Sequence, residues 1–363
     1  MPDRSALLLL CCAAALACAA DSAQEPSAER DPLASFAILV DGEWRMGDAG
    51  DWIQFDTWTF GPRLGSGHGS VRNDTFGADA TGGPWRVVDV YYRHPGSDEV
   101  RMLGLHQHIP GIGRGVAEGV MRFDGEAGEG EFELFQPASG ATPREMGLRW
   151  SFDGPDRYRE TLLEASGDSG LTFLAEWDYE RAERRSELPA LEEEQGVAPA
   201  RHHALLEPWL GRAFTAELER DGADALRVHT TFEWIPLVDV AHARVTTTAS
   251  DGEPEHVLDA YLYHHPTRDE LRCLALSKWG VHEGAFSVAD DGAIELDLWS
   301  DEVGRRVVRL ELDPDSEPGP EPGPEPGPEP GPEPGPALRT RVWSTDGAER
   351  TLTLDLRHAP SAD

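Results

Sequence analysis

The stretch VDVYYRHP at residues 88–95 returns as LDAYLYHHP at residues 258–266, and this repetition decides the fold. A turn follows each copy, and then a second matching stretch, DEVRML at residues 98–103 and DELRCL at residues 269–274. The same landmarks in the same order, far apart in the chain, indicate an internal duplication. A chain of 363 residues has room for two such units.

Further landmarks extend the alignment in both directions. Upstream, Thr57-Trp58 matches Glu233-Trp234, and Gly42-Glu43-Trp44 roughly matches the segment from Gly211 to Phe214. Downstream, the dipeptide EG at 118–119 matches 283–284, and WSFDG at 150–154 matches WSTDG at 343–347. Chance explains one such pair but not an ordered series, so duplication is the better explanation.

Within each copy, short runs of alternating apolar and polar residues end in turn residues. Examples are Pro95-Gly96, Asp124-Gly125 and Asp153-Gly154, which favour hairpins. Consecutive hairpins without long helices build an antiparallel meander, which removes its exposed edges by closing on itself. We therefore predict an all-β fold of two tandem antiparallel up-and-down β-barrels, calycin-like in outline. The apolar stretches at 32–39 and 204–210 are predicted to form short helices that cap a barrel end.

The landmarks divide the chain into a leader (1–20), a tether (21–30), a first barrel (31–182), a linker (183–200) and a second barrel (201–360). The sequence Glu-Pro-Gly-Pro occurs five times at 317–336 and interrupts the second copy, where the alignment makes the loop at 137–145 its counterpart. Proline at every second position prevents helix and ladder alike, so this insertion is expected to be extended. It is either a spacer or an arm for a proline-binding groove. The alignment also leaves the second copy one strand short, unless it borrows a segment.

The charge balance restricts the partners. Lys and Arg total 32 against 67 Asp and Glu, a net charge of -35. Such a chain repels phosphate backbones, so no nucleic-acid partner is expected.

The first twenty residues read as an export signal, with one Arg, an apolar run and small residues through Ala20. Cys18 ends a segment that resembles a bacterial lipobox, which makes it a candidate lipidation site and a membrane anchor if modified. The alternative is simple cleavage near Ala19 or Ala20. In either case the chain is expected to be exported, to the periplasm or the cell envelope. Only Cys273 remains in the body of the chain, so no disulfide is expected there.

A capping turn, the Gly42-Glu43-Trp44 motif and the run of hairpins together resemble the calycins, the group that includes the lipocalins. The resemblance implies that Trp44 plugs the closed end of the barrel and packs on an Arg of the last strand, here Arg181 or Arg184. The second copy departs from the motif, because Phe214 stands one position late. The resemblance also implies a cavity for a small hydrophobic or amphipathic molecule. No residue matches the histidine ligand of haem-binding relatives, so no cofactor is expected.

Alternation assigns the two faces of the predicted strand that follows each first landmark. One face reads Met102, Gly104, His106, His108 in the first copy and Cys273, Ala275, Ser277, Trp279 in the second; the other reads Arg-Leu-Leu-polar in both. We predict that the face with the small residues looks inward and leaves space for a ligand, while the leucines pack under a covering element. The alternative is a leucine-filled interior. The candidate ligand-binding residues are Trp58, Met102, His106, His108, Trp234, Ser277 and Trp279.

Signatures of catalysis and metal binding are weak. His106 and His108 can donate hydrogen bonds to a polar ligand head, but two imidazoles are too few for a tight metal site and the second copy has neither. The sequence has no nucleophile elbow, phosphate-binding loop or Cys-x-x-Cys, so no catalytic residue is predicted.

These features favour a non-enzymatic, exported carrier of a small hydrophobic or amphipathic molecule. Two alternatives stay open. One is a hydratase- or isomerase-type enzyme acting on an apolar substrate, because tandem lipocalin-like barrels occur among such enzymes. The other is a cell-surface structural module with filled barrels, whose proline-rich arm makes the contacts.

Overall fold

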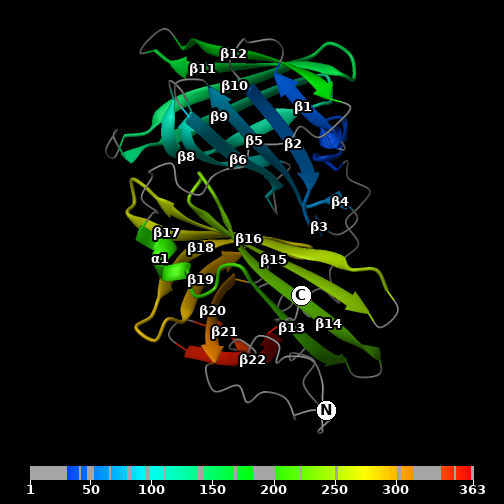
Figure 1. Cartoon of the computed structure of the whole chain (residues 1–363), viewed down its shortest axis with the longest axis vertical. Coiled ribbons are helices and arrows are strands. Elements are labelled where there is room, and N and C mark those ends of the chain that lie inside the picture. Colours follow the sequence, from blue (N-terminus) through cyan, green and yellow to red (C-terminus); the bar gives the residue numbers. More distant parts are fainter. Residues whose placement is uncertain are drawn as a thin grey trace, which may run out of the picture.

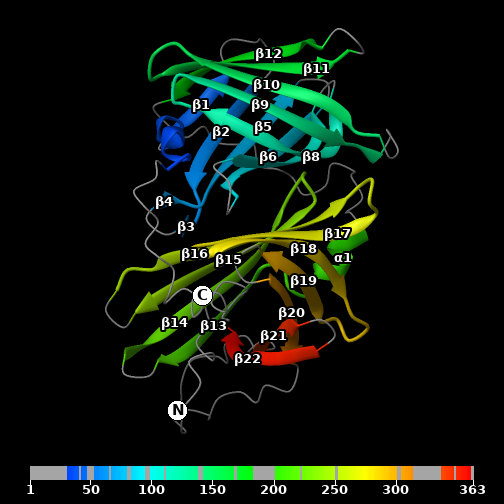
Figure 2. The same cartoon turned by 180° about the vertical axis from the view of Figure 1, so that it is seen from behind.

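The computed structural model describes residues 31–40, 42–46, 53–64, 67–79, 83–94, 99–109, 112–137, 142–166, 170–182, 201–220, 223–249, 252–300, 304–313, 337–346 and 349–360. The leader with Cys18, the linker at 183–200 with Arg184, and the Glu-Pro-Gly-Pro tract lie outside these ranges. Among the described residues the fold is all-β, with two closed antiparallel barrels of ten strands each stacked along the long axis of the molecule (Figures 1 and 2). The predicted fold class is confirmed.

The first barrel is an up-and-down meander that closes when its last strand pairs with its first. A small hairpin, β3 (Arg63–Leu64) and β4 (Gly67–His68), projects between its second and third barrel strands. The barrel strands are β1 (Glu43–Met46), β2 (Ile53–Phe60), β5 (Ser70–Asp79), β6 (Gly83–Arg93), β7 (Val100–Ile109), β8 (Gly113–Phe123), β9 (Ala127–Phe135), β10 (Arg144–Phe152), β11 (Arg157–Ala165) and β12 (Leu171–Ala182).

The second barrel has the same order without the extra hairpin, and it closes through β13 and β22. Its strands are β13 (Arg212–Arg220), β14 (Ala223–Ile235), β15 (Val240–Ala249), β16 (Glu255–His265), β17 (Glu270–Ser277), β18 (Gly280–Val288), β19 (Ile294–Ser300), β20 (Gly304–Asp313), β21 (Ala337–Asp346) and β22 (Glu349–Pro360).

Strand pairing supports most of the duplication and corrects some of its matches. In the first copy Leu103 lies opposite Glu118, and in the second Leu274 lies opposite Glu283, as the alignment requires. Trp150, however, lies in β10, the eighth strand of its barrel, whereas Trp343 lies in β21, the ninth. The match of WSFDG with WSTDG is therefore wrong, because a strand end followed by an Asp-Gly turn fits any hairpin.

Two expectations that depended on that match are also wrong. The second barrel is not one strand short. The long insertion joins β20 to β21, so its counterpart is the tight turn between β10 and β11 rather than the loop at 137–145, which joins β9 to β10.

Each barrel is capped at one end by a short helical segment. In the first, a 3-10 helix (Ala34–Ile38) inserts Phe36 among Trp58, Tyr91 and Trp150, with ring centroids 5.3–6.2 Å apart. In the second, α1 (Arg201–Leu206) begins the segment that buries Leu206 and Trp209 in the core. The predicted caps are confirmed.

The Gly-x-Trp motif closes the first barrel as expected. Trp44 is fully buried, its indole nitrogen donates to the carbonyl of Leu39 over 2.9 Å, and the Arg181 guanidinium lies 4.4 Å from its ring centre. Trp44 and Arg181 are cross-strand partners. A Cβ at Gly42 would collide with that guanidinium, which is why a glycine precedes the tryptophan by two positions. Arg181, one of the two candidate arginines, thus packs on Trp44.

The outward leucines form the contact between the barrels. Leu103 and Leu105 of β7 pack with Leu274 and Leu276 of β17 in one buried cluster, which also contains Val88, Val90, Tyr92, Val116, Ile235, Val238, Val240, Tyr261, Tyr263 and Val281. Met102 and Cys273 instead belong to the separate interior cores of their barrels. The face with the small residues therefore looks inward, the covering element is the other barrel, and the leucine-filled interior is wrong.

Candidate functional site: a polar cavity in the first barrel

The interior of the first barrel contains a cavity of 70 Å³ lined by both polar and apolar side chains. It lies beyond the aromatic plug, the cluster of Phe36, Trp58, Tyr91 and Trp150 beneath the cap. Its walls come from strands all around the barrel. A volume of this size holds a few water molecules or a ligand of a few heavy atoms. The lining residues are Gln54, Asn73, Thr75, Trp85, Val87, Asp89, Met102, His106, Ile112, Phe132, Leu148, Glu160, Leu162, Trp177 and Tyr179.

Two buried carboxyl groups lie at or beside this cavity. Tyr158 donates its hydroxyl to Asp56 Oδ2 over 2.6 Å, and Trp150 donates its indole N–H to Glu160 Oε2 over 2.9 Å. Burial raises the pKa of Asp56 to about 7. Burial, with the nearby charge of Asp56, raises the pKa of Glu160 to about 8. Near neutral pH this interior therefore holds protons that ordinary carboxyl groups would have lost.

Asp89 and His106 face each other across neighbouring strands. Asp89 Oδ1 lies 3.4 Å from His106 Nε2, too far for a good hydrogen bond. Asp89 Oδ1 and His106 Nδ1 are both buried and have no hydrogen-bond partner among the described residues. A Cβ at Gly104 would lie 2.6 Å from each of the two facing atoms, so the glycine makes their approach possible.

The second barrel provides an internal comparison, since its strands have the same order and register. One layer of the first barrel reads Asp56, Thr75, Val87, His106 across neighbouring strands; the same layer of the second reads Thr230, Val245, Leu258, Ser277. The next layer reads Trp58, Asn73, Asp89, Gly104 in the first and Phe232, Ala243, Ala260, Ala275 in the second. The fold therefore does not require ionisable groups here, because the second barrel has small or apolar residues, Thr230 and Ser277 among them, at the same positions.

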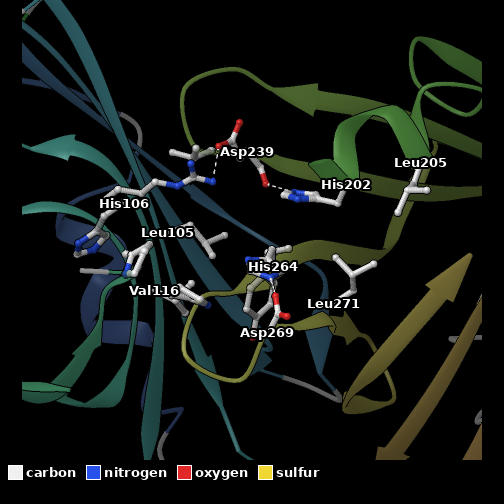
Figure 3. Close-up of a pocket in the computed structure, with 15 residues that line it drawn as sticks. Leu105, His106, Val116, His202, Leu205, Asp239, His264, Asp269 and Leu271 are labelled. Atoms are coloured by element: carbon white, nitrogen blue, oxygen red, sulfur yellow. Dashed lines mark hydrogen bonds and ion pairs between the residues drawn. The ribbon is translucent and has the colours of Figure 1, made fainter. Parts of the chain in front are cut away.

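A larger cleft of 530 Å³ lies between the barrels and borders the same histidine (Figure 3). Leu105, His106 and Val116 of the first barrel face His202 of α1 and His264 of β16 across it. Its apolar wall also includes Leu205 and Leu271.

Ion pairs and hydrogen bonds cross or border the cleft. Arg114 of the first barrel pairs with Asp239 of the second over 2.6 Å, and His202 Nε2 lies 2.7 Å from the Asp239 carbonyl oxygen. Burial lowers the pKa of His202, so its neutral form is favoured there. The cleft thus combines an apolar wall with polar groups.

The candidate residues chosen from the sequence are distributed unevenly. Met102 and His106 line the cavity, and Trp58 packs in the aromatic plug beside it. His108 lies on β7 beyond an irregularity in the ladder, and its side chain is outside the described part of the chain.

The candidates in the second barrel lie elsewhere. Trp234 packs against His203 near α1, with ring centroids 4.5 Å apart, and Phe232 rather than Trp234 occupies the position equivalent to Trp58. The Ser277 hydroxyl donates to the Gly280 carbonyl over 3.0 Å and accepts from the Trp279 N–H. Ser277 and Trp279 thus belong to the β17–β18 turn.

The sequence did not single out Asp56, Asp89 and Glu160. The sequence gives no signal for Asp89, because the repeated landmark matches it with Asp259; only the strand pairing shows that Ala260 holds the equivalent ladder position. Within the described residues, no group of three or more His, Cys, Asp and Glu side chains has the geometry to hold a metal ion. Over the same ranges no helix has the length and hydropathy needed to cross a bilayer.

Comparisons with known proteins give little further information. No protein family and no curated protein matches the sequence. Among solved structures, a Nostoc punctiforme protein of unknown function from the DUF3598 family matches over 92% of this chain and 100% of its own, with 11% identity and a TM-score of 0.18. So low a score leaves the function to be argued from the site itself.

Proposed function

We propose that this chain binds a small amphipathic molecule and that the first barrel is its binding unit. The observation that carries the proposal is the difference between the copies: the first barrel has ionisable groups beside a cavity at ladder positions where the second has only small or apolar residues without an ionisable group. Buried polar atoms without partners are costly, so a protein that retains them has a use for them.

The amphipathic character follows from the two adjoining spaces. The 70 Å³ cavity accommodates only a small polar group, whereas the 530 Å³ cleft has leucine and valine walls. His106 lines both. In this proposal the polar end of the ligand lies in the barrel and its apolar part lies between the barrels.

Kinship with the calycins and export to the cell envelope are parts of the same proposal. The packing of Arg181 on Trp44 supports the first. The export-type leader at 1–20, which contains Cys18, supports the second. Mass spectrometry of the mature N-terminus distinguishes a lipidated Cys18 from simple cleavage.

The test is native mass spectrometry of the full chain purified from its source cell, compared with two matched variants. We expect a bound small molecule in the wild type and in Ser277→Ala, and its loss in His106→Ala, because Ser277 is the equivalent of His106 in the second barrel. Equal occupancy in both variants, or no bound molecule in the wild type, contradicts the proposal.

A second candidate is an acid–base enzyme of the hydratase or isomerase type. The buried carboxyls of Asp56 and Glu160 favour it, since a general acid or base works best with a pKa near the operating pH. Recovery of the captured molecule chemically unchanged after prolonged incubation with the protein would exclude this candidate and leave binding intact.

A further inference from the structure

The cavity of the first barrel is acidic and has no basic side chain other than one histidine. Asp89 and Glu160 are among its lining residues, and Asp56 adjoins the cavity as the cross-strand partner of the lining residue Thr75. No Lys or Arg is among the lining residues that the structure describes. An anionic ligand would meet only like charge there.

Two buried atoms on side chains that line this cavity are acceptors without a hydrogen-bond partner among the described residues. Asp89 Oδ1 is a carboxylate oxygen, and His106, only 9% exposed, leaves Nδ1 without a partner. When Nε2 carries the proton toward Asp89, Nδ1 becomes an acceptor as well. The Thr75 hydroxyl is already used, because it donates to Asn73 Oδ1 over 3.2 Å. What these two atoms lack is a donor.

We propose that the group bound in this cavity is a small organic cation, such as a protonated primary amine. Its N–H groups would donate to Asp89 Oδ1 and His106 Nδ1. Trp85 and Trp177 line the same space and supply aromatic surface of the kind that stabilises cations. This inference rests on the proposed function and specifies the chemical class of its ligand.

Proton release should accompany binding. Burial holds part of the Asp56 and Glu160 population protonated near neutral pH, because their pKa values are raised to about 7 and about 8. A cation beside them favours the charged carboxylates and lowers both pKa values. A neutral ligand has no such effect.

The experiment compares three probes of similar size and different charge by isothermal titration calorimetry on the full chain. The probes are ethanolamine (cation), ethylene glycol (neutral) and glycolate (anion). We expect ethanolamine to bind at least tenfold more tightly than ethylene glycol, and glycolate not to bind. Repeating the ethanolamine titration at pH 7.5 in two buffers of different ionisation enthalpy should show net proton release.

Two variants locate the effect. Asp89→Asn should weaken ethanolamine binding at least tenfold. Asp178→Asn should leave it unchanged, since Asp178 is exposed on β12 and pairs with Arg159. If ethylene glycol or glycolate binds as tightly as ethanolamine, the inference that the ligand is a cation is wrong. The proposal that the first barrel binds a small molecule is then unaffected. Absence of binding by all three, or equal effects of the two variants, also overturns the inference. Because the native mass spectrum of the source material is a separate observation, each proposal can fail without the other.

Discussion

Gly104 shows how a single residue depends on its neighbours in space. In the first barrel it stands between Asp89 and His106, and any side chain would push them apart. In the second barrel the equivalent position is Ala275, and its neighbours are Ala260 and Ser277. The three positions thus differ together between the copies, which marks them as one unit.

The raised pKa of Glu160 leads to a prediction about stability and pH. The folded protein binds this proton more tightly than the unfolded chain, since the pKa is about 8 in the barrel against an ordinary 4.5. The stabilisation is complete below about pH 4.5 and is lost as the pH rises through about 8. Glu160→Gln cannot lose a proton, so its free energy of unfolding should improve relative to wild type by about 2–4 kcal/mol between pH 5 and pH 9.

Urea denaturation at a series of pH values measures this difference. Glu180→Gln is the matched control, because Glu180 pairs with Arg157 on the exposed side of the neighbouring strand. Its difference from wild type should stay nearly constant over that range. Parallel curves for the two variants would show that Glu160 is ionised in the folded protein throughout.

Sequence reasoning identified some of these residues and missed others for a physical reason. The partnership of Trp44 and Arg181, and the inward direction of His106, follow from a motif and from alternation within one strand. Asp56, Asp89 and Glu160 could not be selected, because a chain with 67 acidic residues has carboxylates on most of its strands. Only pairing between strands shows which carboxylates share an interior.

Hairpins explain why one part of the duplication was misread. WSFDG and WSTDG are alike because both end a strand before a turn, but the strands that they end have different positions in their barrels. Ladders of cross-strand partners give the true correspondence, in which β10 and β11 match β20 and β21. A local motif carries no information on strand order, so the sequence alone could not correct this.

The long connection between β20 and β21 gives a prediction at the level of one hairpin. Twenty-three residues separate Asp313 from Ala337, which are cross-strand partners. Replacing residues 314–336 with the two-residue turn Asn-Gly shortens the closed loop more than tenfold, and loop closure should then favour folding by about 1–2 kcal/mol. Thermal and urea unfolding of the shortened chain measure the gain.

Ligand capture serves as the second readout. It should not change in the shortened chain, because the cavity lies in the other barrel. The control replaces residues 317–336 by a Gly-Ser segment of equal length and should leave the stability near that of wild type. Loss of the captured molecule in either variant would connect the tract with binding.

The two barrels meet through equivalent strands. Tyr92, Leu103 and Leu105 of the first have their counterparts Tyr263, Leu274 and Leu276 in the same buried cluster. Polar contacts flank it: the Tyr92 hydroxyl donates to Glu283 Oε1 over 2.7 Å, and Glu118, the equivalent of Glu283, pairs with Arg268. The contact is therefore nearly self-complementary, as in a symmetric dimer.

A charged cluster centred on Asp259 lies on another side of this interface. His242 Nε2 lies 2.8 Å and His256 Nε2 3.0 Å from Asp259 Oδ1, and Gly61 of the first barrel is beside it. Burial by itself raises the pKa of Asp259, but the hydrogen bonds from the two histidines outweigh it and hold the pKa well below its usual range. The carboxylate thus contributes stability that is complete above about pH 4 and is lost as the pH falls further.

Asp259→Asn should therefore destabilise the whole molecule by about 2–4 kcal/mol at pH 7, because it removes the carboxylate with which the buried His242 ring and the neighbouring Arg244 interact. The loss relative to wild type should shrink below about pH 4. Urea denaturation at pH 7, 5 and 3.5 tests both statements. Asp297→Asn is the control, since that carboxylate pairs with Arg305 at the surface and should cost less than about 1 kcal/mol. A similar loss in both variants would contradict the role given to Asp259.

The sequence predicted more about the architecture of the whole molecule than about single residues or strand order. Duplication, barrel closure and a covering layer over the leucines were all expected. The identity of that layer was not, because a repeated pattern shows that each unit has an apolar outer face but not that the two faces meet.

The nearly self-complementary contact between the barrels predicts how one barrel on its own would behave. A protein truncated to one barrel would expose the leucine and tyrosine face to water and would be expected to associate with a second molecule of itself, to a degree set by its concentration. In the intact chain the linker keeps the partner face permanently at hand, so that dilution cannot separate the pair. Two units that could otherwise form only a dissociable dimer are therefore held together in one polypeptide.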